Sequence, residues 1–478
     1  MPDRKNPEKR PLQSGTLRGP PRLNVLLSNG RFPVSLDLAR QLHKARHHVY
    51  TVDPMEFHIC KFSWSVNKSK ETPAPATDPA GYIEAVKKAI QQWKIDIIIP
   101  LHEEIFFLAE SREPEILSRL FAPTFMELYQ LHNKWEYSEL LGHCGLDRPE
   151  VYFCTKPDDF ERLDRSRDWA LKPVLGRSST GVQHIKPGEE VDYSSFELSS
   201  NNPHIAQEWL PGNRYCTYGV FRKGKMQAFC IYPVMETIDG SSSVYFQAVE
   251  HKGIKQYVKT LAEKLQLSGQ LAFDMVETGV TEDDMRRRGE TRSRIHDEFE
   301  KRRKKKTPNY RDPERAVSKG SASHRLVSIE CNPRATSGIH LWSQTPDLAR
   351  SITDRDISLP ELAAQKGRRR QTGPGMLMWE HKNANFKRYM EHTGRLLGTK
   401  DLLWSWKDIV PVLVQPFLLA SYYRICHDKG GIPLPEMFQS DVVWAPGMFG
   451  ESKKMELDIS RPLEETEPQM VLKPRNDD

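Results

Sequence analysis

The sequence has few cysteines and no long apolar run. Its seven cysteines are Cys60, Cys144, Cys154, Cys216, Cys230, Cys331 and Cys426; they are scattered, and no two have the C-x-x-C spacing. This pattern argues against a disulfide framework or a zinc site and for a reducing compartment. The charged opening MPDRKNPEKR lacks the apolar stretch of a secretion signal, and the most apolar region, 409–422, is interrupted by Pro411, Gln415 and Pro416. We therefore expect a soluble cytoplasmic protein with no membrane partner.

The common nucleotide-binding and hydrolase motifs are also absent. Gly176 and Gly181 have the separation of a P-loop, but Val182 stands where that motif requires lysine. There is no G-x-G-x-x-G, no G-x-S-x-G and no H-E-x-x-H. Any phosphate site must therefore be built in another way.

A strong charge of one sign is missing from most of the chain. The net charge is +6, and residues 279–325 alone carry 15 Lys/Arg against 9 Asp/Glu, which leaves 55 of each sign elsewhere. The basic run 301–306 has no interleaved aromatic residues for base stacking. We expect no nucleic-acid partner, although a nuclear or nucleic-acid-binding protein that uses this run is the less favoured alternative.

The N-terminal part has the rhythm of a parallel α/β domain. The length of 478 residues suggests about three domains, and the polar residues 1–21 are expected to be a disordered tail. Apolar runs at 23–27, 48–52 and 95–99 predict buried strands. Pro33 suits the first turn of a helix, and Asp78 with Pro79 predicts another that ends near Trp93. Residues 22–123 are thus expected to form an α/β domain with its ligand chemistry at the carboxyl ends of the strands.

The texture changes further along the chain. A helix capped by Asn133 is followed by short strands from 151 to 248, with a hairpin turn at Lys223 and Gly224. A helix over 251–265 precedes two strands, 269–277 and 326–331. These strands flank the basic segment 279–325, which therefore looks like a mobile insertion at the tip of a hairpin. We expect residues 124–350 to form an α+β domain and 351–478 a mostly helical region.

The segment Ile329-Glu-Cys-Asn-Pro-Arg334 has metal-site chemistry. Side chains alternate in a strand, so Glu330 and Asn332 share a face, with Arg334 continuing it. Asp274 is a charge within an apolar strand, which is costly unless it is paired or binds metal. If the two strands are neighbours, these oxygens suit Mg²⁺. Taken alone, each motif is also compatible with an ordinary exposed strand end.

Two further stretches suggest phosphate and base contacts. Lys172 ends a short apolar strand before the Gly/Ser-rich turn 176–181, where backbone N–H groups can cover phosphates. The strand from His204 to Leu210 ends at Pro211-Gly212 and can offer backbone groups to an adenine edge. His102, Glu103, Glu104 and His340 are low-weight candidates for substrate contacts.

In order and combination, these features resemble the ATP-grasp superfamily, with similarity over about residues 22–350. The resemblance implies an ATP-grasp fold with an N-terminal Rossmann-like domain and a helical C-terminal extension. It implies ATP and Mg²⁺ as cofactors, with Mn²⁺ possible in place of Mg²⁺. It assigns ATP binding to Lys134, Lys172, Ser178, Ser179, Thr180, Gly181, Gln207, Glu208, Trp209 and Leu210, metal binding to Asp274, Glu330 and Asn332, and a catalytic role to Arg334 and Lys172.

The implied activity is that of an ADP-forming ligase that joins a small-molecule carboxylate to an amine through an acyl phosphate. The C-terminal part is similar to that of ATP-grasp proteins of fungal natural-product pathways, which implies secondary metabolism. Two positions depart from the family pattern: Gln207 stands where the hinge usually has Glu, and Arg214 where a ribose-binding Glu is usual. A nucleotide-binding protein without turnover is therefore the main alternative.

Overall fold

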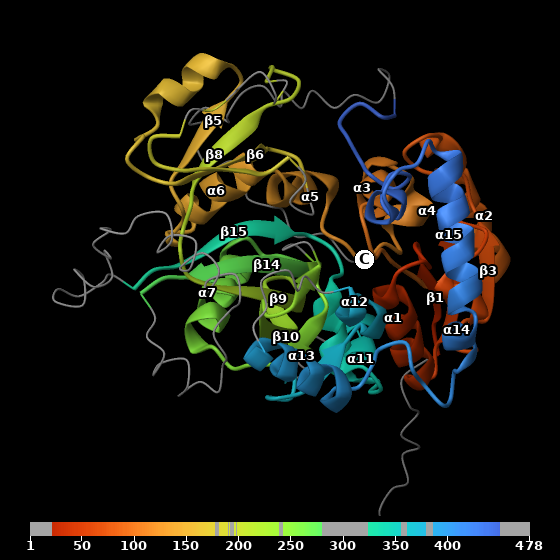
Figure 1. Cartoon of the computed structure of the whole chain (residues 1–478). Helices are drawn as coiled ribbons and strands as arrows, with labels where there is room; N and C mark the ends of the chain where they lie inside the picture. The colour runs from red at the N-terminus through yellow and green to blue at the C-terminus, as the bar shows by residue number, and fades with distance from the viewer. Residues whose placement is uncertain are drawn as a thin grey trace, which may run out of the picture.

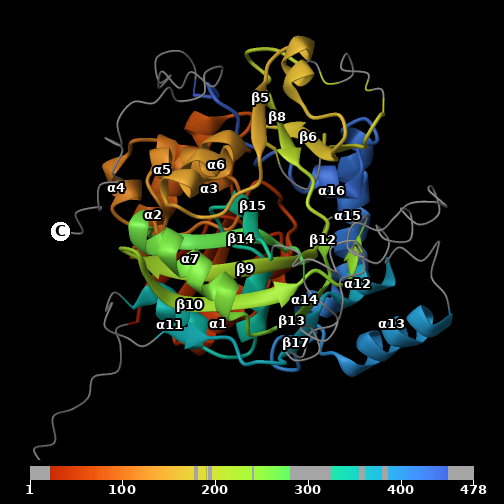
Figure 2. The same ribbon diagram turned by 90° about the vertical axis from the view of Figure 1, so that its left-hand side faces the viewer.

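The computed structural model describes residues 22–176, 181–189, 191, 196, 198–238, 242–279, 324–354, 361–378 and 386–449. Its elements gather around three sheets, which Figures 1 and 2 show from two sides. The N-terminal sheet and its helices are red to brown, the small second sheet is yellow, and the large third sheet is mainly green. The C-terminal helices, in blue, run alongside the first and third of these units.

The N-terminal unit is a parallel sheet covered by helices on both faces. Strands β1 (Asn24–Leu27), β2 (His48–Asp53), β3 (Lys68–Glu71) and β4 (Ile97–Ile99) have the order β3-β2-β1-β4. Alternate residues of β1 face opposite ways: Val25 packs in the cluster of α1 (Pro33–Lys44), and Leu26 in that of α2 (Pro79–Trp93). A single turn, η1 (Ile59–Phe62), follows β2. The predicted α/β unit is therefore confirmed in type.

Four helices lead into a small antiparallel sheet. They are α3 (Glu104–Glu110), α4 (Pro114–Leu117), α5 (Phe125–His132) and α6 (Lys134–His143). Asn133 caps α6 as the sequence predicts, because its side chain accepts from the backbone N–H groups of Trp135 and Glu136. The sheet contains β5 (Val151–Cys154), β6 (Trp169–Pro173), β7 (Gln183–Ile185) and β8 (His204–Glu208) in the order β5-β8-β6-β7, with η2 (Pro157–Arg162) after β5.

The large sheet has the order β15-β14-β9-β10-β16. It contains β9 (Asn213–Arg222), β10 (Lys225–Pro233), β14 (Gly269–Glu277), β15 (Leu326–Asn332) and the short β16 (Leu362–Ala363). β9 and β10 form the predicted hairpin, in which Lys223 and Gly224 both have positive φ. Helix α7 (Lys252–Lys264), capped by His251, buries its apolar face on this sheet. β14 and β15 pair antiparallel, so the segment 279–325 does join neighbouring strands; residues 280–323 lie outside the described part.

The C-terminal region is less separate from the large sheet than expected. After η4 (Ser337–Trp342) and α11 (Asp347–Thr353), β16 extends the large sheet, and β17 (Arg369–Gln371) pairs with β13 (Tyr245–Gln247). A second minor pair joins β11 (Thr237–Ile238) to β12 (Ser242–Ser243). These two-to-three-residue strands carry no alternating pattern of their own, so the sequence did not indicate them.

Helices make up the rest of the C-terminal region. They are α12 (Gly373–Leu377), α13 (Phe386–Gly398), α14 (Val410–Leu413), α15 (Gln415–Asp428) and α16 (Leu434–Met437). Leu418 and Tyr422 of α15 pack with Leu36 and Ile59 of the N-terminal unit, beside which α15 runs in Figure 1. Within the described ranges, no helix combines the length and the apolar character needed to cross a bilayer.

Candidate functional site

Two carboxylates face each other across β14 and β15. Asp274 is the register partner of Glu330, and Asn332 lies two residues further along, opposite Ala272. Burial and the neighbouring Glu330 raise the pKa of Asp274. Burial also acts to raise the pKa of Glu330, but the cations of Lys134 and Lys172 outweigh it and lower that pKa. Like charges directly opposite each other destabilise a sheet, so this pair calls for a cation.

The donor set fits magnesium that arrives with a nucleotide. Over the described residues, no group of three or more His, Cys, Asp or Glu side chains could hold a metal ion. Two carboxylates and one amide are instead the small set of oxygen ligands that Mg²⁺ uses when phosphates and waters complete its coordination. The chemistry of Asp274, Glu330 and Asn332 therefore suits an ion shared with ATP.

Lys134 lies beside Glu330 of the carboxylate pair. It is the first residue of α6, is buried, and its Nζ is 3.9 Å from Glu330 Oε1. The same Nζ donates to the carbonyl of Gly176 at 2.6 Å, and the Lys134 backbone N–H donates to Val174 O at 3.1 Å. Lys134 thus connects Glu330 to Gly176, the first residue of the Gly/Ser turn.

Lys172 occupies a buried position between the small and large sheets. Its Nζ donates to Gln207 Oε1 at 2.8 Å and to the Ile329 carbonyl at 3.5 Å. Gln207 Nε2 donates to the same carbonyl at 3.4 Å. Burial, together with the cations of Lys134 and Arg214, lowers the pKa of Lys172 to about 8, against the opposing effect of Glu330. β6 and β8 of the small sheet are therefore joined to β15 of the large sheet by this pair.

The stretch 207–210 runs from the end of β8 into the connection between the two sheets. Glu208 is held through its side chain by arginines outside the connection. The ring of Trp209 stacks on His184 with centroids 3.9 Å apart, and its backbone N–H donates to Asp168 O at 3.0 Å. Leu210 is half-buried. These contacts hold residues 207–210 between the two sheets, and the contact of this stretch with adenine stays a prediction.

Only one residue of the predicted phosphate flap lies within the described chain. Ser178, Ser179 and Thr180 are outside it. Gly181 has φ +71°, and a Cβ there would come within 3.2 Å of the Pro173 side chain. A backbone with positive φ favours glycine. The conformation of the chain where the turn leads into β7 therefore explains why a glycine occupies position 181.

Two arginines flank the carboxylates. Arg334, half-buried after β15, helps to lower the pKa of Glu330. Arg214 lies on β9, where it is the register partner of Val276 on β14. It is two residues from Cys216, the register partner of Asp274. The cation of Arg214 lowers the pKa of both Asp274 and Lys172. The sequence marked Arg214 only as a departure from a family pattern; the structure places it among the charged groups of the site.

His132 is a member of this cluster that the sequence did not single out. It ends α5 and is buried, and burial lowers its pKa to about 4. The charges that act on it are those of Glu103, Lys134, Glu330 and Arg334. Its imidazole is therefore neutral at pH 7. A histidine inside an amphipathic helix has no local signal that separates it from an ordinary core residue.

His340, Glu103 and Glu104, which the sequence offered as candidates for substrate contacts, form hydrogen bonds or ion pairs within the fold. His340 forms a buried pair with Asp37, Nδ1 to Oδ2 at 2.9 Å. Glu104 Oε1 accepts from Ser28 Oγ and from the backbone N–H groups of Leu101 and His102. Glu103 Oε2 accepts from the Trp444 N–H at 3.3 Å. These contacts organise the carboxyl edge of the N-terminal sheet.

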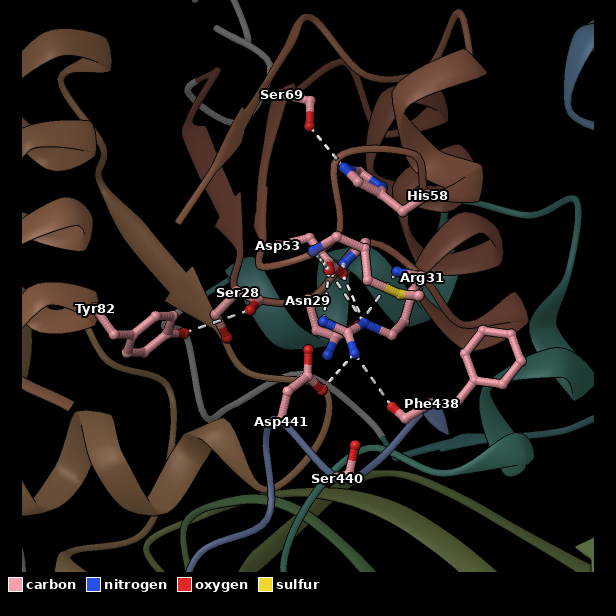
Figure 3. Close-up of polar contacts among 12 residues, drawn as sticks. Ser28, Asn29, Arg31, Asp53, His58, Ser69, Tyr82, Phe438, Ser440 and Asp441 are labelled. Atoms are coloured by element: carbon pink, nitrogen blue, oxygen red, sulfur yellow. Dashed lines mark hydrogen bonds and ion pairs between the residues drawn. The ribbon is translucent and has the colours of Figure 1, made fainter. Parts of the chain in front are cut away.

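The same edge holds a buried ion-pair cluster that the sequence analysis missed. Figure 3 shows Arg31, just after β1, pointing between Asp53 at the end of β2 and Asp441 of the C-terminal segment. Arg31 Nη2 is 2.6 Å from Asp53 Oδ1, and Nη1 is 2.6 Å from Asp441 Oδ1; Nη1 also donates to the Phe438 carbonyl. No sequence-local pattern links Arg31 to a residue 410 positions away.

Comparison with solved structures bears on the fold. N5-carboxyaminoimidazole synthetase from Staphylococcus aureus in complex with ADP superposes with a TM-score of 0.51 and 13% identity, covering 78% of this chain and 86% of that one. A second structure of the same enzyme gives a TM-score of 0.50 and 12% identity, covering 73% of this chain and 80% of that one. No family model and no curated protein matches the sequence. The likeness confirms the ATP-grasp fold that the sequence resemblance implies.

Proposed function

We propose that this chain, which has an ATP-grasp fold, binds magnesium-ATP and uses it to join a small-molecule carboxylate to an amine. The observation that carries the proposal is the Asp274–Glu330 pair, with Lys134 and Lys172 close enough to lower the Glu330 pKa. Lys172 and Gln207 connect the two sheets at this point. Half-buried opposed carboxylates next to buried lysines suit a divalent cation and phosphates.

The ADP complex of the similar Staphylococcus aureus enzyme supports an adenine nucleotide as the ligand. In the proposed arrangement, backbone groups of 207–210 contact the base, and the turn 176–181 covers the phosphates. Residues 22–123 form the N-terminal domain, 124–350 the ATP-binding domain, and 351–478 the C-terminal region. The domain bounds, like the substrate contacts, are part of the proposal.

The proposed reaction has two steps. A carboxylate oxygen of the substrate attacks the γ-phosphorus of ATP, the bond to the β–γ bridging oxygen breaks, and ADP leaves. The amine nitrogen then attacks the carbonyl carbon of the acyl phosphate, phosphate leaves, and the nitrogen loses a proton. Phosphoryl transfer of this kind depends on positioning and on neutralising charge.

Each residue of the cluster has a defined part in these steps. Asp274, Glu330 and Asn332 would hold Mg²⁺, which supplies charge neutralisation at the phosphates. Lys172 and Arg334 place cations on phosphate oxygens, and Lys134 anchors the phosphate-covering turn through Gly176. His132, neutral at pH 7, adds no positive charge to the cluster. We propose Arg214 as an additional phosphate contact, because it lies on β9 two residues from Cys216, the register partner of Asp274, and its cation acts on both Asp274 and Lys172.

The substrate class is proposed from chemistry and resemblance. An amino acid or another small carboxylate fits the ligase reaction, and the similarity of the C-terminal part to fungal natural-product enzymes suggests a role in secondary metabolism, in the cytoplasm. The amine and the carboxylate are to be found by screening amino acids and other carboxylic acids for substrate-dependent ADP release.

The decisive experiment combines that screen with trapping. Hydroxylamine added with magnesium, ATP and the active carboxylate should yield a hydroxamate together with one equivalent of ADP, because it captures an acyl phosphate. Formation of AMP and pyrophosphate instead would contradict the proposal. Binding of ATP with no carboxylate-dependent ADP release across the screen would favour the alternative of a nucleotide-binding protein without turnover.

A further inference from the structure

Behind the connection 207–210 lies a cavity of about 410 Å³. It is lined mainly by three arginines and three glutamates: Arg148, Arg167, Arg325, Glu139, Glu150 and Glu208. The lining charges balance, and the arginines are already paired, which makes an additional charged ligand unfavourable there. The residues that line the cavity instead form a network of ion pairs and hydrogen bonds around Glu208.

Glu208 is held from three directions. Its Oε1 accepts from Arg325 Nη1 at 2.9 Å and lies 3.0 Å from Arg167 Nη2. Its Oε2 accepts from the Glu150 backbone N–H at 3.2 Å, and the Glu208 backbone N–H donates to Glu150 O at 2.8 Å. The Glu208 side chain is only 13% exposed. Its position, and with it the start of the hinge backbone, is therefore fixed by these partners.

Arg325 connects this network to the basic segment 279–325, because it is the last residue of that segment. Its Nη2 donates to Arg148 O at 3.0 Å, its Nε is 3.4 Å from Asp147 Oδ2, and its own carbonyl accepts from the Thr278 N–H. Arg325 therefore links the exit of the insertion to the loop before β5 and to Glu208.

The chain that leads into the insertion, at the end of β14, also lies close to the hinge 207–210. The carboxylate of Glu277, at the end of β14, is buried between His251, at 3.1 Å, and His324, at 2.6 Å. A Cβ on Gly212, two residues after Leu210, would lie 2.3 Å from the Glu277 carbonyl oxygen, so the backbones are in close contact. Both described ends of the insertion thus adjoin the hinge.

We propose that Arg325, together with Arg167, is a positioning residue that sets the affinity for ATP by fixing the hinge from behind. This rests on the proposed function, in which the backbone of 207–210 contacts adenine. A hinge that is already ordered loses less conformational entropy when the base binds. Arg325, at the end of the insertion, then acts on the ATP site, and the basic run 301–306 is not needed for this effect.

The test measures ATP affinity separately from turnover. Titration with a fluorescent ATP analogue and magnesium should show a dissociation constant about three- to fivefold higher for Arg325→Ala, because partly exposed ion pairs contribute up to about 1 kcal/mol. kcat at saturating ATP should stay within about twofold. Arg325→Lys should give a smaller increase, because it keeps the charge but loses the planar fork. Arg162→Ala is the matched control: Arg162 is 67% exposed, belongs to the same sheet unit, and pairs with Asp159 instead.

A double-mutant cycle distinguishes the specific contact from general damage. Glu208→Gln should raise the dissociation constant by a similar factor, and adding Arg325→Ala to it should have little further effect, since the two share one interaction. Fully additive effects, or an unchanged affinity in Arg325→Ala and Arg325→Lys, would overturn the inference. Removing 280–323 while keeping His324 and Arg325 should leave the affinity within about twofold; a loss as large as that of Arg325→Ala would also overturn it. A wild-type protein that binds no ATP would overturn the proposed function itself.

Discussion

Two charge clusters of this protein, one buried and one half-buried, differ in how directly their carboxylates contact cations. At the carboxyl edge of the N-terminal sheet, Arg31 meets Asp53 in a bidentate contact and Asp441 in a second one. Between β14 and β15, Asp274 and Glu330 face each other, and the nearest cation in an ion pair, Lys134, is 3.9 Å from Glu330. The first cluster is saturated within the chain, whereas the second carries like charges side by side.

The difference separates a structural role from a ligand site. The Arg31 guanidinium is engaged by carboxylates of this chain and joins segments distant in sequence, so it is not available to bind a ligand. Opposed carboxylates raise the pKa of one member, and their oxygens, together with the amide of Asn332, suit a divalent cation. We therefore propose a structural role for Arg31 and a ligand-binding role for Asp274 and Glu330, and substitutions at these residues test the proposal.

The largest effect is expected at the unsaturated cluster. Glu330→Gln keeps the shape but removes a metal ligand, so carboxylate-dependent ADP release should fall at least about 10³-fold. The midpoint of urea unfolding without nucleotide should change little, because a like-charge contact is also removed. Glu361→Gln is the control, since Glu361 pairs with Lys255 on the surface. Substantial remaining activity would remove Glu330 from the metal site.

Substitutions in the cluster of Arg31, Asp53 and Asp441 should instead lower the stability of the fold. Arg31→Met leaves Asp53 buried without its cation and should lower the free energy of unfolding by about 3–5 kcal/mol. Urea unfolding followed by tryptophan fluorescence measures this. If that variant fails to accumulate, Asp441→Asn offers a milder test, with an expected loss of about 1–2 kcal/mol. Stability unchanged by both substitutions would mean that the cluster does not hold the C-terminal segment in place.

The smallest effect concerns pH. Lys172 has its pKa lowered to about 8, so it is mostly protonated at pH 7 and loses its charge as the pH rises through 8. The dissociation constant of ATP should therefore rise above pH 8, by up to about tenfold per pH unit. Gln207→Glu places a carboxylate beside Lys172 Nζ, which should raise the pKa of Lys172 and move the loss of affinity to higher pH. A flat profile from pH 7 to 9.5 in the wild type would exclude Lys172 from phosphate binding.

Much of the fold could be predicted where the signal is local. Asn133 and Asp78 cap helices because each carries a side-chain acceptor just before a helical pattern. The hairpin at Lys223 and Gly224 and the pairing of β14 with β15 follow from turn chemistry and apolar strands. The short strands β16 and β17 were not predicted, because two or three residues show no period and form only against β10 and β13.

The candidate site divides in the same way. Asp274, Glu330 and Lys172 stand out in the sequence as charges within or at the end of apolar strands. His132 and Arg214 do not, because their importance comes from neighbours on other elements. The partners of Glu208 were also out of reach, since Arg167 and Arg325 approach it from different parts of the chain.

The sequence by itself placed Glu330 and Asn332 on one strand face through alternation, and it predicted Asp274 beside them on the condition that the two strands are neighbours, which the structure confirms. It also indicated the absence of the commoner nucleotide motifs, and hence an ATP site of another kind. Only the tertiary structure decided which buried charges are satisfied: Arg31 finds Asp441 from the far end of the chain, while Asp274 finds another carboxylate. The physical reason is that pairing of charges depends on three-dimensional neighbours, whereas strand faces and helix caps are set by residues a few positions apart.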